Sequence, residues 1–321
     1  MKYQRLGRTG LEVSRIALGC MSFGERNEFH QWTLDEESSQ PYFRQAVELG
    51  ITFWDTANTY GGGSSEEFVG RAIKQYTRRE DVVLATKVWG KMHDGPGGSG
   101  LSRKAILEQI DASLTRLGTE YVDLYQIHRF DPDTPVEETM EALHDVVRAG
   151  KVRYLGASSM WAWQFAKLQH AADLHSWTRF VSMQNQYNLI RRDDEQELLP
   201  LCADQGVGSI PYSPLAKGKL GKPWGTQSLR ADTDRVARAL ARDSDRQSVD
   251  ALESMAAKRG VPMAQVALAW LLTRPVVSAP IVGATKPHHL TDAAAALELE
   301  LTEAELTQLE EPYVERPRNW Y

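Results

Sequence analysis

Short apolar runs that are typical of buried strands alternate with segments of helical spacing along almost the whole chain. At least one predicted helix lies between each strand and the next. The predicted strands are Ile16–Leu18, Ile51–Trp54, Val82–Thr86, Val122–Ile127, Val152–Ala157, Phe180–Met183, Val207–Pro211 and Ser278–Val282. Strands that alternate with helices predict a parallel sheet with right-handed crossovers. Repeated along the whole chain, the pattern predicts an α/β fold of the (β/α)8 TIM barrel type.

The predicted helices are marked by apolar residues at helical spacing and by signals at their ends. Two of them begin with a capping box, Ser64 with Glu67 and Thr134 with Glu137. The predicted helical segments are Tyr42–Leu49, the segment that begins at Ser64, Ser102–Leu117, the segment from Thr134 to Gly150, Trp161–Leu174, Glu195–Gln205, Val249–Lys258, Met263–Leu272, His288–Leu297 and Glu303–Leu309.

Two further segments lie outside the alternation. Tyr3–Leu6 and Leu11–Ser14 flank a glycine-containing turn and predict an N-terminal β-hairpin. Residues from Ser213 to about Arg242 predict a long loop after the seventh strand. A length of 321 residues suits one barrel with insertions, so we expect a single domain over residues 1–321. A doubly wound open sheet is the alternative, but no G-x-G-x-x-G fingerprint follows the first strand.

Charge and cysteine content narrow the classes of partner. A net charge of −6 argues against binding to a nucleic-acid backbone, which favours basic domains. With Cys20 and Cys202 as its only cysteines, the chain can build neither a disulfide framework nor a cysteine-rich metal site. The N-terminus lacks the apolar core of a signal peptide, and no run of about 18 apolar residues occurs. We expect a cytoplasmic protein with no membrane partner.

Polar side chains with complementary chemistry follow three consecutive predicted strands. Asp55 and Tyr60 follow the second strand, Lys87 the third and His128 the fourth. Because the C-terminal ends of barrel strands form one face, these side chains are expected to converge there. Each alone has a structural interpretation, such as a turn aspartate or an exposed tyrosine. Their shared location is what indicates catalysis.

The four residue types suggest proton transfer to a carbonyl group. A buried Asp55 needs a charged partner, which Lys87 can provide. This pair beside Tyr60 is expected to favour the phenolate and to lower the phenol pKa from about 10. Tyr60 could then donate a proton near neutral pH, and His128 could hold a substrate carbonyl oxygen by hydrogen bonding.

The chain resembles the aldo-keto reductase family, as an NADPH-dependent member of bacterial type, from the Gly7-Arg8-Thr9-Gly10 turn to the last helix. The matching segments are Asp55-Thr56-Ala57-Asn58-Thr59-Tyr60-Gly61, Ala85-Thr86-Lys87, Tyr125-Gln126-Ile127-His128, Gly150-Lys151-Val152-Arg153-Tyr154-Leu155-Gly156-Ala157-Ser158, Gln184-Asn185-Gln186-Tyr187-Asn188 and Pro211-Tyr212-Ser213-Pro214-Leu215. The resemblance implies reduction of aldehydes or ketones by hydride transfer from NADPH, with Tyr60 as general acid, Lys87 and Asp55 tuning it, and His128 orienting the carbonyl.

The resemblance also implies a set of cofactor-binding residues. Ser158, Ser159 and Gln184 are expected to hold the nicotinamide carboxamide, and Tyr212 to stack on the ring. Backbone amides of the loop after the seventh strand are expected to bind the pyrophosphate, at Ser213, Leu215, Gly218 and Leu220. After the eighth strand, the expected contacts are Gly283, Thr285, Lys286 for the 2′-phosphate, His289, and Asp292 near the adenine. The four residues expected at the nicotinamide also have structural interpretations: helix caps for Ser158 and Ser159, a strand-end hydrogen bond for Gln184, and core packing for Tyr212.

Several positions depart from the commoner family pattern, so NADH stays open as a cofactor. Ser159 and Ala293 stand where many members have asparagine, Gly283 where some have lysine, and His289 where arginine is frequent. Arginines of the long loop could supply the missing phosphate contacts, although a solvated charged loop is the simpler interpretation. They are Arg230, Arg235 and Arg238.

Tryptophans near the predicted rim suggest an aromatic pocket for aryl or aliphatic aldehydes and ketones. They are Trp32, Trp54, Trp89 and Trp161, and packing in the core is the competing interpretation. The glycine-rich loop from Gly90 to Gly100 could cover the substrate.

Two rival functions are weighed against the reductase. A regulatory nicotinamide-binding β subunit would keep the same residues with little turnover, but the chain begins almost directly at the hairpin, without an extension for a partner. A metal-dependent barrel enzyme needs several His or carboxylate ligands, and the rim offers only Asp55 and His128. We therefore expect a small carbonyl substrate and no metal, while oligomeric state and physiological substrate are not predicted.

Overall fold

Eight parallel strands form the centre of the fold. A computed structural model of the chain describes residues 1–26, 31–226 and 242–316. Within these residues the strands are β3 (Ala17–Gly19), β4 (Phe53–Asp55), β5 (Val83–Val88), β6 (Val122–Ile127), β7 (Val152–Ser158), β8 (Phe180–Gln184), β9 (Gly208–Ser209) and β10 (Ile281–Gly283). Their hydrogen-bonded order is β10-β3-β4-β5-β6-β7-β8-β9. Every neighbouring pair except β10 and β3 is therefore consecutive in the sequence.

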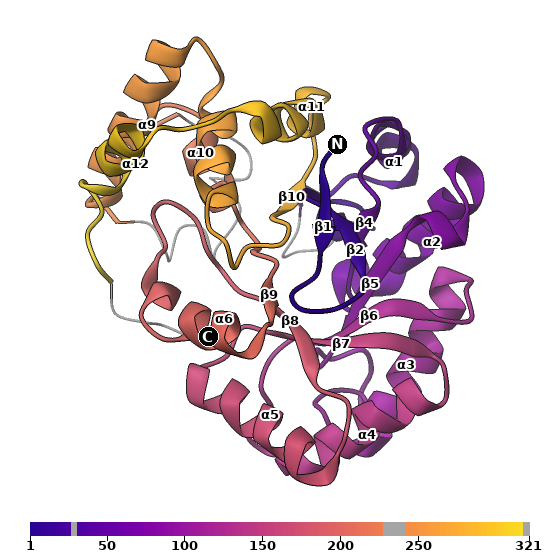
Figure 1. Cartoon of the computed structure of the whole chain (residues 1–321). Helices are drawn as coiled ribbons and strands as arrows, with labels where there is room; N and C mark the ends of the chain where they lie inside the picture. The colour runs from indigo at the N-terminus through magenta and orange to yellow at the C-terminus, as the bar shows by residue number, and fades with distance from the viewer. Residues whose placement is uncertain (27–30, 227–241, 317–321) are drawn as a thin grey trace.

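The two ends of this sheet approach each other. An isolated parallel bridge joins Ser209 to Val277, and the backbone amide of Ser278 donates to the carbonyl of Ser209 at 2.7 Å. The amide of Ile281 donates to the carbonyl of Pro211 at 2.8 Å. The arrangement agrees with the predicted (β/α)8 fold, and Figure 1 shows the helices around the central strands.

The connecting helices pack in sequence order around the sheet, with α2 on α3, α3 on α4 and α4 on α5. The described helices are α1 (Glu36–Glu48), α2 (Ser64–Tyr76), α3 (Arg103–Leu117), α4 (Val136–Arg148), α5 (Ala162–His175), α6 (Leu198–Gln205), α9 (Asp245–Arg259), α10 (Met263–Leu272), α11 (His288–Ala295) and α12 (Glu303–Glu310). Among them, none has both the length and the apolar composition that a membrane span requires.

The predicted N-terminal hairpin is present and fills one end of the barrel. Strands β1 (Tyr3–Arg5) and β2 (Glu12–Ser14) pair antiparallel. Leu6 and Val13 are fully buried in one apolar cluster with barrel residues that include Phe53 and Leu124. Gly7, at φ +56°, lies so close to the backbone of Gly206 and Gly208 that any side chain would clash. The hairpin therefore leaves the C-terminal strand ends as the open face.

Both predicted capping boxes are wrong. Ser64 is the first residue of α2 rather than its cap, and its hydroxyl donates to the carbonyl of Gly61 at 2.8 Å. Thr134 lies before the cap of α4, which is Pro135, and its hydroxyl donates to Asp131 at 2.8 Å. In both places the preceding turn engages the hydroxyl, so it is not available to the first turn of the helix.

The start of one helix and the content of one loop also differ from the sequence prediction. The first helix begins at Glu36 instead of Tyr42, because the Asp35 carboxylate accepts from the amide of Ser38 and caps the helix despite Pro41 inside it. The predicted long loop after the seventh strand contains the short 3-10 helix η5 (Ala216–Gly221). Its central part, with Arg230, Arg235 and Arg238, lies outside the described residues.

Gly70 gives a test of this packing. An alanine at a helix interior usually stabilises by about 1 kcal/mol relative to glycine. At Gly70 in α2, however, a Cβ atom would lie 2.3 Å from the carbonyl oxygen of Leu117. We expect Gly70→Ala to lower the free energy of unfolding by about 1–3 kcal/mol, since backbone must move. Urea denaturation measures it.

The matched control is Gly10→Ala, because a Cβ there meets no atom within 4 Å. It is expected to change the free energy of unfolding by less than about 0.5 kcal/mol. Equal effects of the two substitutions would contradict the close contact between α2 and α3.

Candidate active site

The four predicted catalytic side chains come together at the C-terminal ends of β4, β5 and β6. Asp55 is the last residue of β4, Tyr60 begins the 3-10 helix η2 (Tyr60–Gly63), Lys87 lies in β5, and His128 directly follows β6. The pairing of β5 with β6 sets Lys87 opposite Gln126. The common rim inferred from the alternating pattern is therefore present.

Lys87 is the centre of this group. Its side chain is fully buried, and its ammonium donates to Asp55 Oδ1 at 2.6 Å, to the carbonyl of Thr56 at 2.8 Å and to the Tyr60 hydroxyl at 3.2 Å. These contacts use all three of its protons. The ammonium also lies 4.7 Å from the centroid of the Tyr60 ring.

The electrostatics keep Lys87 charged. Burial alone lowers the pKa of an ammonium, but the charges and hydrogen bonds of Asp55 and Tyr60 together outweigh it and raise the pKa of Lys87 above its usual value. A permanent positive charge therefore lies next to the phenol oxygen.

The pKa of Tyr60 moves in the direction opposite to the sequence prediction. Burial raises the pKa of the phenol above its usual value, and Lys87 opposes this shift without reversing it. The contribution of desolvation to the pKa of Tyr60 could not be estimated from the sequence, because it depends on how deeply the phenol is buried. The consequence is a Tyr60 that carries its proton at neutral pH, as a proton donor must.

His128 completes the group as a neutral imidazole. Burial, with Lys87 and Arg129 adding to it, holds the pKa of His128 well below its usual range. Its ring lies edge-on to the Tyr60 ring, with 5.8 Å between centroids. Arg129 also acts on the pKa of Tyr60, so this residue, absent from the sequence prediction, belongs to the electrostatic surroundings of the site.

The second oxygen of Asp55 is bound by two glutamines. Gln126 Nε2 and Gln184 Nε2 each donate to Asp55 Oδ2 at 2.9 Å. Gln184 Nε2 also donates to Gln126 Oε1 at 3.1 Å. Gln184 was predicted as a cofactor residue, whereas Gln126 was not assigned a role. Its position two residues before His128 in β6 was the signal that could have found it, because alternate strand residues face the same side.

The residues expected around the nicotinamide are neighbours. Ser158, the last residue of β7, and Ser159 have their hydroxyls 3.2 Å apart. The Ser159 hydroxyl donates to the Tyr212 hydroxyl at 3.4 Å, and the Ser159 amide donates to the carbonyl of Gln184 at 3.1 Å. Ser159 has a φ of +50°, which is uncommon for a residue with a side chain and is found at functional sites.

The loop after β9 has the same unusual backbone. Ser213, Ala216 and Lys217 have φ values of +51°, +48° and +57°, and Gly218 follows at +98°. Leu215 is partly buried and Leu220 fully buried in an apolar cluster. Leu220 is 0% exposed as a whole residue, and its backbone amide donates to the carbonyl of Leu215 at 3.2 Å, so neither its side chain nor its amide is presented to a ligand in this arrangement.

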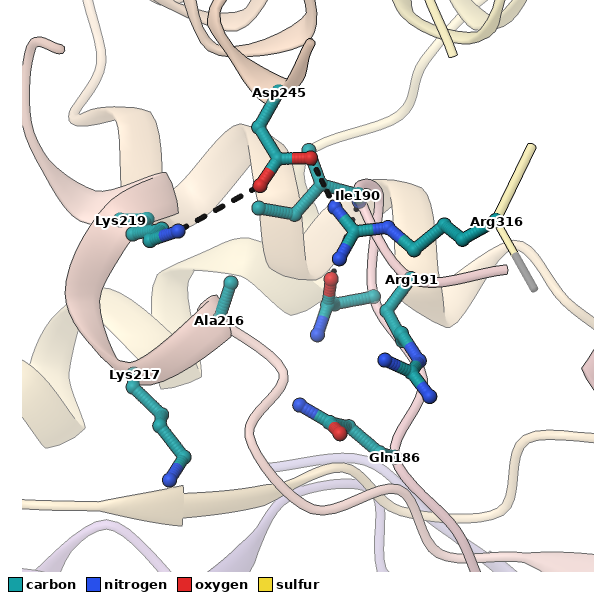
Figure 2. A pocket seen from close by; sticks show the side chains of 9 residues that line it. Gln186, Ile190, Arg191, Ala216, Lys217, Lys219, Asp245 and Arg316 are labelled. Atoms are coloured by element: carbon teal, nitrogen blue, oxygen red, sulfur yellow. Dashed lines mark hydrogen bonds and ion pairs between the residues drawn. The ribbon is translucent and has the colours of Figure 1, made fainter. Parts of the chain in front are cut away.

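Ion pairs connect the η5 part of this loop to α9 and to the C-terminal segment. Asp245, at the start of α9, forms an ion pair with Arg316 of the C-terminal segment and a second with Lys219 of η5, at 3.6 Å. Figure 2 shows Asp245 reaching both. Asp245 and Arg316 are only 5% and 7% exposed, so the C-terminal segment and η5 are tied to one buried carboxylate.

The segment after β10 contains the residues predicted for the 2′-phosphate and adenine. Gly283 and Lys286 are exposed. The Thr285 amide donates to His289 Nδ1 at 3.2 Å, and Gln265 donates to Asp292 at 3.1 Å. Burial, with the charges of His288 and Lys286, lowers the pKa of His289 to about 4. His289 is therefore neutral at pH 7, and Lys286 is the positive side chain of this segment.

The predicted tryptophans divide between core and surface. Trp54 as a substrate contact is wrong: it is fully buried, packs on Phe43 and donates its indole N–H to the carbonyl of Ile51. Trp32 is 7% exposed. Trp161 is the N-cap residue of α5 and is half-buried. Trp89 directly follows β5, is 37% exposed and has a φ of +145°. A strained, exposed aromatic residue two positions after Lys87 stays a candidate substrate contact.

Comparison with known proteins agrees with this geometry. The model of the aldo/keto reductase family matches residues 15–313. The chain belongs to the aldo/keto reductase family. It is therefore related to oxidoreductases whose common reaction is carbonyl reduction, and the family resemblance seen in the strand-end motifs is confirmed.

Individual relatives cover nearly the whole chain. A versiconal hemiacetal acetate reductase of Aspergillus parasiticus is 46% identical, over 98% of this chain and 97% of the relative. The aldo-keto reductase AMT2 of Alternaria alternata is 42% identical, over 98% of this chain and 92% of the relative. A protein of Schizosaccharomyces pombe named provisionally as an aryl-alcohol dehydrogenase is 42% identical, over 98% and 96%. These relatives are fungal and lend no support to the expected bacterial type.

The lowered imidazole pKa values predict acid sensitivity. In the unfolded chain both histidines return to a pKa of about 6.5. Because the pKa of His128 and of His289 is lower in the folded protein, the unfolded chain binds more protons, and stability falls as pH drops below about 6.5. We expect His289→Asn, which keeps an acceptor for the Thr285 amide but cannot titrate, to make this fall shallower. Urea unfolding at several pH values between about 7 and 5 measures it; a slope equal to that of the parent would contradict the assignment.

Proposed function

We propose that the chain is an NADP-dependent carbonyl reductase in which Tyr60 is the general acid. The observation that carries the proposal is the buried Lys87 ammonium, which donates at once to Asp55 and to the Tyr60 hydroxyl. An alkoxide that forms beside such a phenol can take its proton, and the phenolate left behind is stabilised by the adjacent charge.

Each residue of the group has a distinct role in this proposal. Tyr60 releases its proton from the phenol oxygen to the carbonyl oxygen of the substrate. Lys87 stabilises the phenolate as it forms, and Asp55 holds the ammonium in place and balances its charge. Neutral His128 donates a ring N–H to the same carbonyl oxygen and fixes its direction, since a neutral imidazole keeps one donor nitrogen.

The described residues fit a nicotinamide. No hydrogen bond from the described residues reaches the Gln184 amide oxygen, whereas its nitrogen is engaged by Asp55 and Gln126. That oxygen can accept from a carboxamide N–H2, and the paired hydroxyls of Ser158 and Ser159 can bond the carboxamide oxygen. Tyr212 offers a ring for stacking. When bound, a reduced nicotinamide supplies the hydride.

NADPH is proposed over NADH because of the segment after β10. Exposed Lys286 follows the last barrel strand and precedes α11, and it can bind a 2′-phosphate by a charge-assisted hydrogen bond. Gly283 and Thr285 bring backbone to the same place, Asp292 lies further along α11, and His289 contributes as an uncharged group.

The proposed substrates are aryl or aliphatic aldehydes and ketones. Trp89, two positions after Lys87 in the chain, supplies an exposed aromatic surface. The name of one relative refers to aryl alcohols and that of another to the reduction of a hemiacetal acetate, which supports this class without selecting a member of it.

A regulatory nicotinamide-binding subunit is the alternative function. The relatives reported above are named as reductases or dehydrogenases, which does not favour it. The two functions separate in a panel of aldehydes monitored at the nicotinamide absorbance. Tight cofactor binding without turnover of any member would support the regulatory role.

Tyr60→Phe tests the acid. Loss of the phenol proton is expected to lower kcat for an aromatic aldehyde by about 10²–10⁴-fold, with cofactor affinity nearly unchanged. Steady-state kinetics and a cofactor titration measure the two quantities. Tyr3→Phe, which removes a hydroxyl bonded to Gly50 at the hairpin, is the control and is expected to keep the parent kcat. If Tyr60→Phe is folded and as fast as the parent, the acid is another group.

Lys286→Ala tests the 2′-phosphate contact. We expect the Kd for NADPH to rise about tenfold, the usual effect of losing a hydrogen bond to a charged group, and the Kd for NADH to stay the same because it lacks that phosphate. Fluorescence titration with both cofactors measures the pair. A parallel rise for NADPH and NADH would place the phosphate elsewhere.

A further inference from the structure

Gln126 connects two parts of the site that the proposed function treats separately. Its amide nitrogen donates to Asp55 Oδ2 at 2.9 Å, and its amide oxygen accepts from Gln184 Nε2 at 3.1 Å. Asp55 belongs to the proton-donating group, and Gln184 to the residues expected at the nicotinamide. The Gln126 side chain is fully buried in β6 between them.

The orientation of both amides is determined by Asp55. A carboxylate can only accept, so each glutamine must direct its nitrogen, not its oxygen, at Oδ2. Once Gln126 is oriented in this way, its oxygen faces the nitrogen of Gln184. Gln184 is thereby held by two acceptors, and its own oxygen is left for a ligand. A flipped Gln184 would place its oxygen against the oxygens of Asp55 and Gln126.

The neighbouring strand leaves room for this arrangement. In β7, a Cβ atom at Gly156 would lie 2.9 Å from Gln126 Cγ and 2.5 Å from the Ser182 hydroxyl. Gly156 pairs directly with Gln126 in the strand register. The absence of a side chain at this one position therefore lets the long side chain of Gln126 extend within the barrel, across from β4 towards β8.

We propose that Gln126 is a positioning residue that fixes the amide of Gln184 against Asp55, so that nicotinamide binding and the Asp55–Lys87–Tyr60 group share one hydrogen-bond network. The inference rests on the proposed function. It predicts that Gln126 acts on the cofactor through Gln184, and on proton donation through Asp55.

The first test is a double-mutant cycle on cofactor affinity, which needs no turnover. Gln126→Met, Gln184→Met and the double variant are titrated with NADPH by fluorescence. We expect each single variant to raise the Kd about 10-fold, and the double variant to bind no more weakly than Gln184→Met alone. Two effects that multiply, or a parent-like Kd for Gln126→Met, would overturn the inference.

The second test is a pH profile of kcat for Gln126→Glu. At high pH the introduced carboxylate faces Asp55, and two like charges repel; when it is protonated, it can again donate to Asp55. We expect the kcat of this variant, relative to the parent, to rise at least fivefold between about pH 8 and pH 6. A profile parallel to that of the parent would contradict the role towards Asp55. This variant also serves if Gln126→Met does not fold.

Gln169→Met is the matched control. Gln169 is a buried glutamine on α5 whose amide makes two hydrogen bonds to the backbone of Phe180, away from the site. It is expected to lose stability, with cofactor Kd and kcat at the parent values. If the parent binds NADPH but reduces no carbonyl, the proposed function fails while the binding cycle still decides the role of Gln126. If it neither binds nor turns over, both are wrong.

Discussion

The ion pair between Lys87 and Asp55 is the interaction on which the arrangement of the site depends. Both side chains are almost completely removed from solvent. Burying each charge in this way costs several kcal/mol unless an opposite charge matches it. Asp55 accepts from Lys87, Gln126 and Gln184, and Lys87 in turn donates to Thr56 and Tyr60. Satisfying one buried pair thus fixes the relative positions of β4, β5, β6 and β8.

Most of the architecture could be predicted from the sequence, because it follows from hydrophobic periodicity. The bounds of β6 match the apolar run at Val122–Ile127, and α3 ends where Gly118 predicts. The convergence of Asp55, Tyr60, Lys87 and His128 followed from the rule that barrel strands end on one face. Local signals were less reliable. The hydroxyls of Ser64 and Thr134 could bond either a preceding turn or a helix, and the sequence cannot rank two such partners.

The missed features are those that depend on burial. The pKa of Tyr60 rises because desolvation of the phenol exceeds the attraction of Lys87, and desolvation is known only once the surroundings are. Successive residues of a strand point to opposite sides of the sheet, and Trp54 is on a side that is buried in the core. A shift of one residue would have reversed its side, and the sequence alone could not decide between core packing and substrate contact. Gln126 was overlooked because its importance depends on contacts with β4 and β8, which lie far away in sequence.

The hairpin at the N-terminal end of the barrel also bears on proton supply in the proposed reaction. Leu6 and Val13 fill that end with apolar side chains that carry no exchangeable proton. In the proposed reaction, a proton that restores the Tyr60 phenol would therefore arrive from the face formed by the C-terminal strand ends, where the substrate is expected to bind. Under that proposal, proton return and alcohol release share one entrance, and this follows from the way the barrel is closed at its other end rather than from any moving part.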